Sequence, residues 1–267
     1  MGKFTVKKKI CKKCADCVTI CPTHILTVDE DHFPMPKDDT AWERCMGCGH
    51  CVAICPTSAL SVPNVNIDKS PALIPIYPYT QEKLLQLFSH RRSVRQYRNK
   101  VISKNDLQEL FELTELAPSA RNIRPTKWIS LSGRKVLDEV IGKCADTMRK
   151  MNNEYLDYFV TAYENGQDFI LRGCTNVAIA YGPEENPWTL TDGVISTTHL
   201  ELASSLKGFG ACWAGLLLMC IAENKDLRKL IGLQEKMIAT GALMLGYPKL
   251  HFHHIPERQK PNVHWIH

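Results

Sequence analysis

A cysteine pattern that occurs twice near the N-terminus constrains this chain more than any other feature. One copy spans residues 11–21 and the other residues 45–55, each spaced Cys-x-x-Cys-x-x-Cys-x-x-x-Cys and followed by proline. Residues beside the cysteines recur at the same offset: Val18, Ile20, Thr23, Leu26 and Val28 return as Val52, Ile54, Thr57, Leu60 and Val62. The segment is therefore a duplicated half-domain with four potential metal ligands in each half.

The cysteine content and the residues before Cys11 indicate in which cellular compartment such a chain is expected. The chain has 12 cysteines, and those outside the repeat are Cys144, Cys174, Cys212 and Cys220. The N-terminus runs from lysines straight into Cys11 without an apolar stretch, which predicts no secretory signal and favours metal over disulfides. The longest apolar run, residues 213–222, is about half of what a bilayer span needs. We expect a cytoplasmic protein with no membrane partner.

The spacing of the cysteines favours iron–sulfur clusters. Three cysteines at this spacing can wrap one corner of a 4Fe-4S cluster, and the fourth, before proline, can point to the other cluster. Two structural zinc sites are the alternative, because paired Cys-x-x-Cys also suits tetrahedral zinc. The formal net charge of +5 falls to about +1 when two clusters of about −2 each are counted. The basic excess thus gives no reason to expect a nucleic-acid partner.

These motifs resemble the bacterial two-cluster ferredoxin, a small βαββαβ-like domain. The resemblance implies that the two halves exchange their fourth ligand. One 4Fe-4S cluster would then be held by Cys11, Cys14, Cys17 and Cys55, and the other by Cys45, Cys48, Cys51 and Cys21. We expect this domain to span residues 1–64 and to transfer electrons one at a time. A proline-rich segment, residues 65–79, then predicts a fairly stiff linker.

Residues 80–267 carry the signals of a second domain with both helices and strands. Apolar periodicity predicts a helix over residues 81–90, and Ser103-x-x-Asp106 is a capping box that begins a helix running to Leu116. Strands are predicted over residues 127–132 and 177–181. Between the first two helices lies Arg91-Arg92-Ser93-Val94-Arg95. Guanidinium and hydroxyl groups at this density are typical of a phosphate-binding segment, and an exposed basic turn is the alternative.

Four motifs of this second part, in order, resemble the FMN-dependent nitroreductase family. They are Arg-Arg-Ser-x-Arg from Arg91, Ala-Pro-Ser-x-x-Asn from Ala117, Gly-x-Gly-x-Cys-Trp-x-Gly from Gly208, and Gly246-Tyr247-Pro248. The resemblance implies an α+β fold with a mixed, mostly antiparallel sheet flanked by helices. It also implies a homodimer with FMN at the interface. The chain departs from the family's usual pattern at Arg124 and at Thr126-Lys127-Trp128, near the expected flavin, which leaves the substrate and the use of NAD(P)H open.

The same resemblance implies which residues contact the flavin. Its phosphate would be held by Arg91, Arg92, Ser93 and Arg95, with Arg258 closing the site from the C-terminal segment, and its ring and ribityl chain would meet Pro118, Ser119, Asn122, Trp213, Ala214 and Gly215. No side chain stands out as a catalytic acid or base, so the chemistry falls to the flavin. We therefore predict an iron–sulfur flavoprotein oxidoreductase that passes electrons from the clusters to FMN and on to a nitro, quinone or enone-like acceptor. A dehydrogenase that exports electrons through the clusters, and a non-catalytic electron carrier or redox sensor, are the alternatives. The electron source, either a donor protein or NAD(P)H, stays open.

Overall fold

The computed structural model describes residues 4–63, 65–72 and 81–267. The chain divides into two compact units, Met1–Pro78 with Arg121–Ile123, and Tyr79–Ala120 with Arg124–His267. Of the predicted linker, residues 73–79 lie outside the described residues, while Ile67–Lys69 form a short 3-10 helix, η2. Among the helices of the described residues, none combines the length and apolarity needed to cross a membrane.

The first unit has the strand and helix order predicted for a two-cluster ferredoxin domain. Strand β1 (Thr5–Val6) pairs antiparallel with β4 (Leu60–Ser61), and β2 (Leu26–Val28) pairs antiparallel with β3 (Pro34–Pro36). Between them lie helix α1 (Asp16–Thr19), 3-10 helix η1 (Ala41–Arg44) and helix α2 (His50–Ala53). The predicted fold of this domain is confirmed.

The sequence repeat extends to the backbone conformation. The residue before α1, Ala15, is left-handed with φ 60°, and the residue before α2, Gly49, has φ 74°. The N–H of Val18 donates to Ala15 O at 3.0 Å, and the N–H of Val52 donates to Gly49 O at 3.0 Å. Each half therefore turns its chain in the same way after its first two cysteines, which gives the two metal-binding halves matching shapes.

The second unit is built on a four-stranded sheet with the order β5-β6-β8-β7. Its strands are β5 (Lys127–Ser132), β6 (Asn176–Pro183), β7 (Gly210–Trp213) and β8 (Met237–Gly246). All neighbouring strands pair antiparallel, and Ser93 adds one parallel bridge to Ala211 on β7. The predicted α+β fold with a mostly antiparallel sheet is confirmed.

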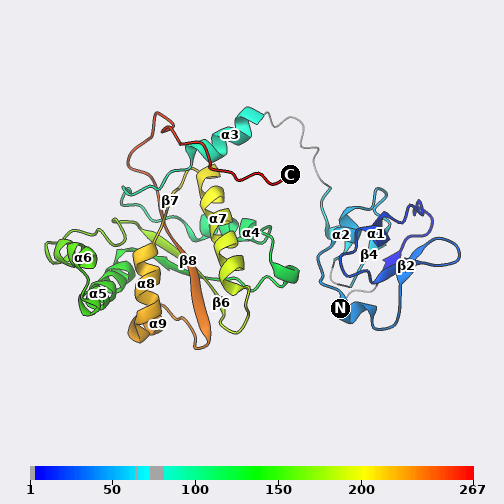
Figure 1. Cartoon of the computed structure of the whole chain (residues 1–267), viewed down its shortest axis with the longest axis horizontal. Helices are drawn as coiled ribbons and strands as arrows, with labels where there is room; N and C mark the ends of the chain where they lie inside the picture. The colour runs from blue at the N-terminus through cyan, green and yellow to red at the C-terminus, as the bar shows by residue number, and fades with distance from the viewer. Residues whose placement is uncertain (1–3, 64, 73–80) are drawn as a thin grey trace. The chain divides into compact units, whose positions relative to one another are not determined.

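Helices cover both faces of this sheet (Figure 1). They are α3 (Gln81–His90), α4 (Lys104–Thr114), α5 (Arg134–Met151), α6 (Glu154–Glu164), α7 (Thr189–Leu206), α8 (Gly215–Glu223) and α9 (Lys225–Leu230). Alternate residues of β8 face opposite sides: Ala242 and Met244 join a core with α5, α6, α8 and α9, whereas Leu243 and Leu245 join a core with α4 and α7. Because both faces are covered, the central strands are apolar throughout instead of alternating with polar residues.

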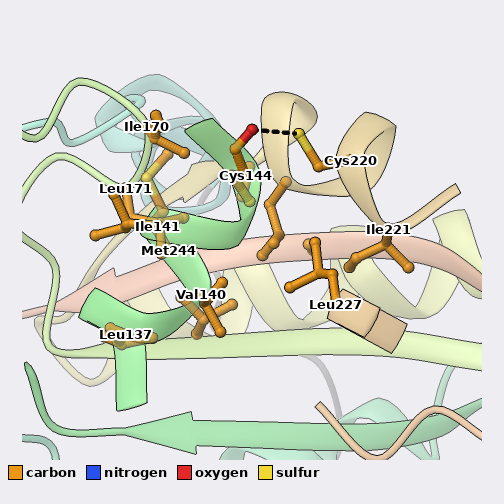
Figure 2. Close-up of a cluster of buried hydrophobic side chains, with 14 of the residues drawn as sticks. Leu137, Val140, Ile141, Cys144, Ile170, Leu171, Cys220, Ile221, Leu227 and Met244 are labelled. Carbon is orange, nitrogen blue, oxygen red and sulfur yellow. Dashed lines mark hydrogen bonds between the residues drawn. The ribbon is translucent and has the colours of Figure 1, made fainter. Parts of the chain in front are cut away.

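Cysteines outside the repeat behave as buried apolar residues. Cys144, Cys174 and Cys220 are fully buried. Figure 2 shows Cys144 on α5 facing Cys220 on α8, whose thiol donates to the Cys144 carbonyl oxygen at 3.6 Å. These thiols help to pack two helices together and lie in the larger core of the second unit.

Two details of the predicted helices and loops need correction. Helix α4 begins as predicted, with Ser103 Oγ accepting from the Asp106 N–H at 3.1 Å, but it ends at Thr114 and leaves Leu116 exposed beyond it. Gly210 does not make room for a ligand: a Cβ there would lie 2.7–2.8 Å from the Val94 side chain. This glycine instead lets the segment with Val94 pack against β7.

Candidate functional site

The eight cysteines of the repeat line two separate cavities in the first unit. One cavity is lined by Cys11, Cys14, Cys17 and Cys55. The other is lined by Cys21, Cys45, Cys48 and Cys51. Each cavity thus has three cysteines from one half of the repeat and the fourth from the other half.

The chain around these cavities supplies hydrogen bonds to sulfur in both halves. The Ala59 N–H donates to Cys55 Sγ at 3.2 Å. Cys55 and Cys21 each lie beside a threonine hydroxyl two residues on, at 3.9 and 3.7 Å. Hydrogen bonds to the sulfurs are among the features that set the potential of an iron–sulfur cluster.

The electrostatics of the thiols fit a multi-iron group. Burial raises the pKa of the Cys51 thiol to about 12, and the neighbouring Cys21, Cys48 and Cys45 add to the rise. Four thiolates so close together require positive charge between them, which iron supplies. The four cysteines of each set surround a cavity. The residues therefore fit 4Fe-4S clusters.

The two cavities differ in their surroundings. Lys12, Lys13 and Asp16 line the first cavity, which therefore has a net positive lining, and its Cys14 is exposed. The second cavity is lined by no charged side chain of the described residues, but by apolar groups that include Trp42 and Met46. A cluster near positive charge and solvent is easier to reduce than one enclosed by apolar groups. We therefore expect two unequal reduction potentials.

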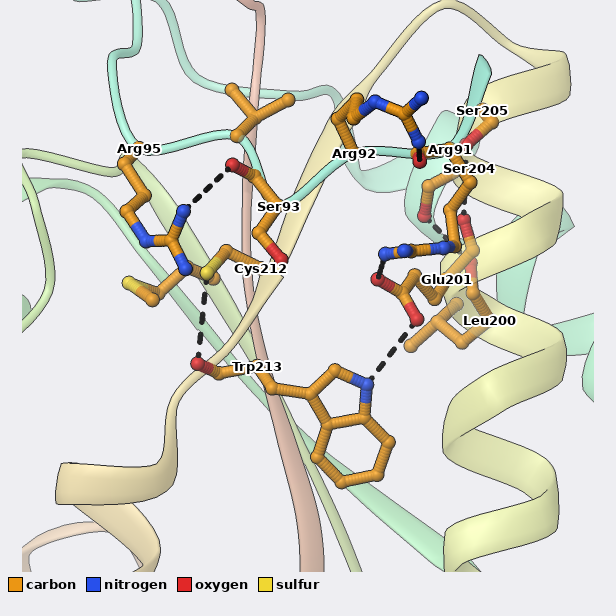
Figure 3. Close-up of polar contacts among 12 residues, drawn as sticks. Arg91, Arg92, Ser93, Arg95, Leu200, Glu201, Ser204, Ser205, Cys212 and Trp213 are labelled. Carbon is orange, nitrogen blue, oxygen red and sulfur yellow. Dashed lines mark hydrogen bonds and ion pairs between the residues drawn. The ribbon is translucent and has the colours of Figure 1, made fainter. Parts of the chain in front are cut away.

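In the second unit, the predicted phosphate-binding segment runs from the end of α3 along β7. The Val94 N–H donates to Ala211 O at 2.9 Å. Figure 3 shows the arginines of this segment pointing in different directions. Arg91 Nη1 donates to Glu201 Oε1 at 2.9 Å, and Arg95 Nη1 donates to Ser93 O at 3.4 Å. Because successive side chains of an extended segment point in opposite directions, the arginines from Arg91 to Arg95 lie on two sides of this segment.

Arg92 lies apart from the other members of this set. It lines a pocket with Val94, Phe209 and His90, whereas Arg91, Ser93 and Arg95 do not. Its Nη1 donates to Arg91 O at 2.8 Å, and its Nε is buried without a partner within the described residues. The sequence placed Arg92 beside Arg91, but the alternation of an extended chain turns the two side chains apart.

Trp213 lies on the same side as Arg91. Its indole Nε1 donates to Glu201 Oε2 at 3.2 Å (Figure 3). Ala214 and Gly215 follow directly, where β7 ends and α8 begins, and a Cβ on Gly215 would meet nothing within 4 Å. The chain beside Trp213 therefore leaves open space at the start of α8.

Glu201 was missed by the sequence reasoning, although it joins two of the predicted residues. It lies on α7 as one glutamate in a helix, a pattern that usually indicates a solvated face, and its side chain is only 6% exposed. The apolar residues beside it in the sequence indicated a buried part of the helix, and Leu200 and Ala203 are indeed buried.

The remaining predicted residues lie elsewhere. Ser119 Oγ accepts from the Arg124 N–H at 3.0 Å, and Ala120 N donates to Asp192 Oδ1 at 3.0 Å. Asp192 and Glu201 are both on α7, about 13 Å apart along its axis at 1.5 Å per residue. The structure therefore attaches the loop containing Ser119 to a different part of α7 from Arg91.

The outer members of the predicted site are accessible. Pro118 is exposed, Asn122 lies in the short 3-10 helix η3 (Ala120–Asn122) with φ 55°, and Arg258 is exposed in the C-terminal segment 251–267, which forms neither helix nor strand. Their proposed roles stay predictions.

Comparison with known proteins matches both units. Residues 88–247 match the model of the nitroreductase family, and residues 10–60 match that of the 4Fe-4S dicluster domain. A protein of Archaeoglobus fulgidus, with the provisional name NADH dehydrogenase/NAD(P)H nitroreductase, is 28% identical over 63% of this chain and 87% of its own. The recognition made from sequence motifs is confirmed.

Solved structures give the same fold for the second unit. A nitroreductase with bound FMN from Bacteroides fragilis has a TM-score of 0.58 and 20% identity, covering 68% of this chain and 98% of its own. A nitroreductase with bound FMN from Desulfitobacterium hafniense has a TM-score of 0.56 and 20% identity, covering 67% and 96%. The family match spans more than half of the sequence, and it confirms the predicted enzyme class, a nitroreductase-like oxidoreductase. The chain therefore belongs to the nitroreductase family and carries an N-terminal domain of the 4Fe-4S dicluster type.

Proposed function

We propose that this protein is an iron–sulfur flavoprotein oxidoreductase in which electrons pass from two 4Fe-4S clusters to FMN and on to an organic acceptor. The observation that carries this proposal is the presence of two four-cysteine cavities in a chain that also belongs to the nitroreductase family. Two metal centres of this kind exchange single electrons. A nitro, quinone or enone-like compound is the proposed acceptor.

The proposed flavin site combines cationic and apolar groups. Arg91, Ser93 and Arg95 would hold the phosphate, and Trp213, Ala214 and Gly215 would line the ring. Guanidinium groups bind phosphate oxygens through paired hydrogen bonds, which supports the first part. Arg92 lines a different pocket from these residues, so its contact with the same phosphate stays a prediction. FMN, when bound, supplies conversion between one-electron and two-electron transfer.

We further propose a homodimer with FMN at the interface, in which Pro118, Ser119, Asn122 and Arg258 complete the site. Contribution from a second copy would account for residues that lie apart from Arg91 within one chain. The proposed domains are residues 1–64 and 80–267, with residues 65–79 as linker, and the proposed location is the cytoplasm. FMN-bound relatives of the same fold support the choice of cofactor.

The proposal is tested by anaerobic reconstitution followed by rapid reduction of the clusters with a one-electron donor. Flavin absorbance should bleach after the clusters are reduced, and the double change Cys14→Ala/Cys51→Ala, which removes a ligand from each cavity, should slow this bleaching at least tenfold. Cys174→Ala, a buried cysteine outside both cavities, is the matched control. Equal flavin reduction rates in all three chains would contradict the proposed path.

Screening with candidate acceptors then separates the alternatives. Turnover with nitro, quinone or enone compounds supports the proposed direction. Flavin reduction by a metabolite, followed by reduction of the clusters, would instead support a dehydrogenase. Reversible reduction without turnover in either direction would support an electron carrier or redox sensor.

A further inference from the structure

Glu201 is a buried carboxylate that joins two segments of the proposed flavin site. Its Oε1 accepts from Arg91, which follows α3, and its Oε2 accepts from the indole of Trp213, at the end of β7. Its side chain is 6% exposed, whereas that of Arg91 is 31% exposed. A carboxylate is buried at high cost unless it is paired and hydrogen bonded, and here each oxygen has one donor.

We propose that Glu201 is a positioning residue that fixes the Arg91 guanidinium and the Trp213 indole for binding of the flavin. This inference rests on the proposed function, because it assigns the two partners to the same cofactor. Figure 3 shows the carboxylate between the two side chains, with Arg91 above it and the indole below. One charged group thus aligns residues that are far apart in the sequence.

The geometry leaves Arg91 able to bind an anion while it is held. A guanidinium has five N–H donors in a rigid plane, and Glu201 takes the bond from Nη1. The exposed part of Arg91 can therefore present its other donors to a phosphate. Without Glu201, the arginine side chain would regain several rotatable bonds, and FMN binding would have to order them again.

The orientation of Trp213 depends on the same carboxylate. The indole Nε1 has donor capacity only, so the bond to Oε2 selects one ring position. The change Glu201→Gln keeps the length of the side chain but replaces one acceptor oxygen by an NH2 donor group. In the observed geometry the amide cannot accept from both the guanidinium and the indole, so at least one of these partners is released.

The test measures FMN affinity and tryptophan emission of the full-length chain. Glu201→Gln should raise the Kd for FMN by up to about tenfold, which is the upper end of the factor expected when binding must order one released side chain again. It should also shift the emission of the flavin-free chain, and this shift should vanish in a Trp213→Phe background. Glu139→Gln, at an exposed position within α5, is the matched control and should change neither reading.

A double-mutant cycle separates positioning from a general loss of structure. If Glu201 acts through Arg91 and Trp213, Glu201→Gln should add less than about twofold to the Kd in an Arg91→Ala/Trp213→Phe background. An effect of the same size in both backgrounds would overturn the inference, as would unchanged FMN affinity and emission in Glu201→Gln. Failure of the unmodified chain to bind FMN would refute the proposed function itself. Equal FMN affinity of the unmodified chain and Glu201→Gln would refute only the role of Glu201.

Discussion

Exchange of the fourth cysteine between the two halves can be tested with two pairs of substitutions. Cys14→Ala/Cys55→Ala removes two cysteines from one cavity and leaves the other complete. Cys14→Ala/Cys21→Ala removes one cysteine from each cavity. If each cavity holds one 4Fe-4S cluster, the first pair should retain about one intact cluster per chain and the second pair none. Ligation by consecutive cysteines would reverse these two results.

The measurement is the electron paramagnetic resonance signal of the reduced 4Fe-4S clusters after anaerobic reconstitution. The unmodified chain should give about two spins per chain, and the two variants about one and zero. Total iron alone is a weaker measure, because a cavity with three cysteines can hold an incomplete cluster. Cys144→Ala/Cys220→Ala, outside the repeat, provides the control for two lost thiols. A full cluster signal in Cys14→Ala/Cys21→Ala would refute the assignment of ligands.

Three further predictions follow from local geometry. Gly210→Ala should lower the free energy of unfolding by about 1–3 kcal/mol, because the added Cβ would press on Val94; an unchanged urea midpoint would contradict this packing. Lys12→Gln/Lys13→Gln should lower the reduction potential of one cluster by about 80 mV, since each of the two nearby charges contributes on the order of 1 kcal/mol; potentiometric titration should leave the other cluster unmoved. Ser103→Ala should cost about 1 kcal/mol, because α4 loses the oxygen that caps its first turn, whereas an unaltered thermal midpoint would mean that water replaces the cap.

Much of the fold could be predicted because its signals are local. The capping serine of α4 acts within one helical turn, and the run Lys127–Ser132 forms β5 with the predicted limits. The end of α4 was predicted too late, since Leu116 fits the apolar period but lies beyond the last helical turn. Periodicity identifies a helix more reliably than its end, which depends on the residues that satisfy the final carbonyl groups.

The candidate site could be predicted only in part. The motif from Arg91 to Arg95 identified a segment rich in hydrogen-bond donors, yet its side chains point to different sides once the chain extends along β7. Gly210 belongs to the motif from Gly208, and the space beside its Cα is occupied by Val94. Residue type shows what a side chain can bind, while its direction follows from the backbone and from neighbouring elements.

The sequence by itself determined the duplicated cysteine pattern, the family and the layout of two unlike domains, because ligand spacing and apolar periodicity act over short stretches of chain. Only the tertiary structure decided which arginines share a side, and that Glu201 joins Arg91 to Trp213. Contacts between residues far apart in the sequence depend on how whole elements pack. The partners of the buried glutamate on α7 therefore cannot be predicted from the residues around it in the sequence, because they are set by the packing of the helix against the sheet.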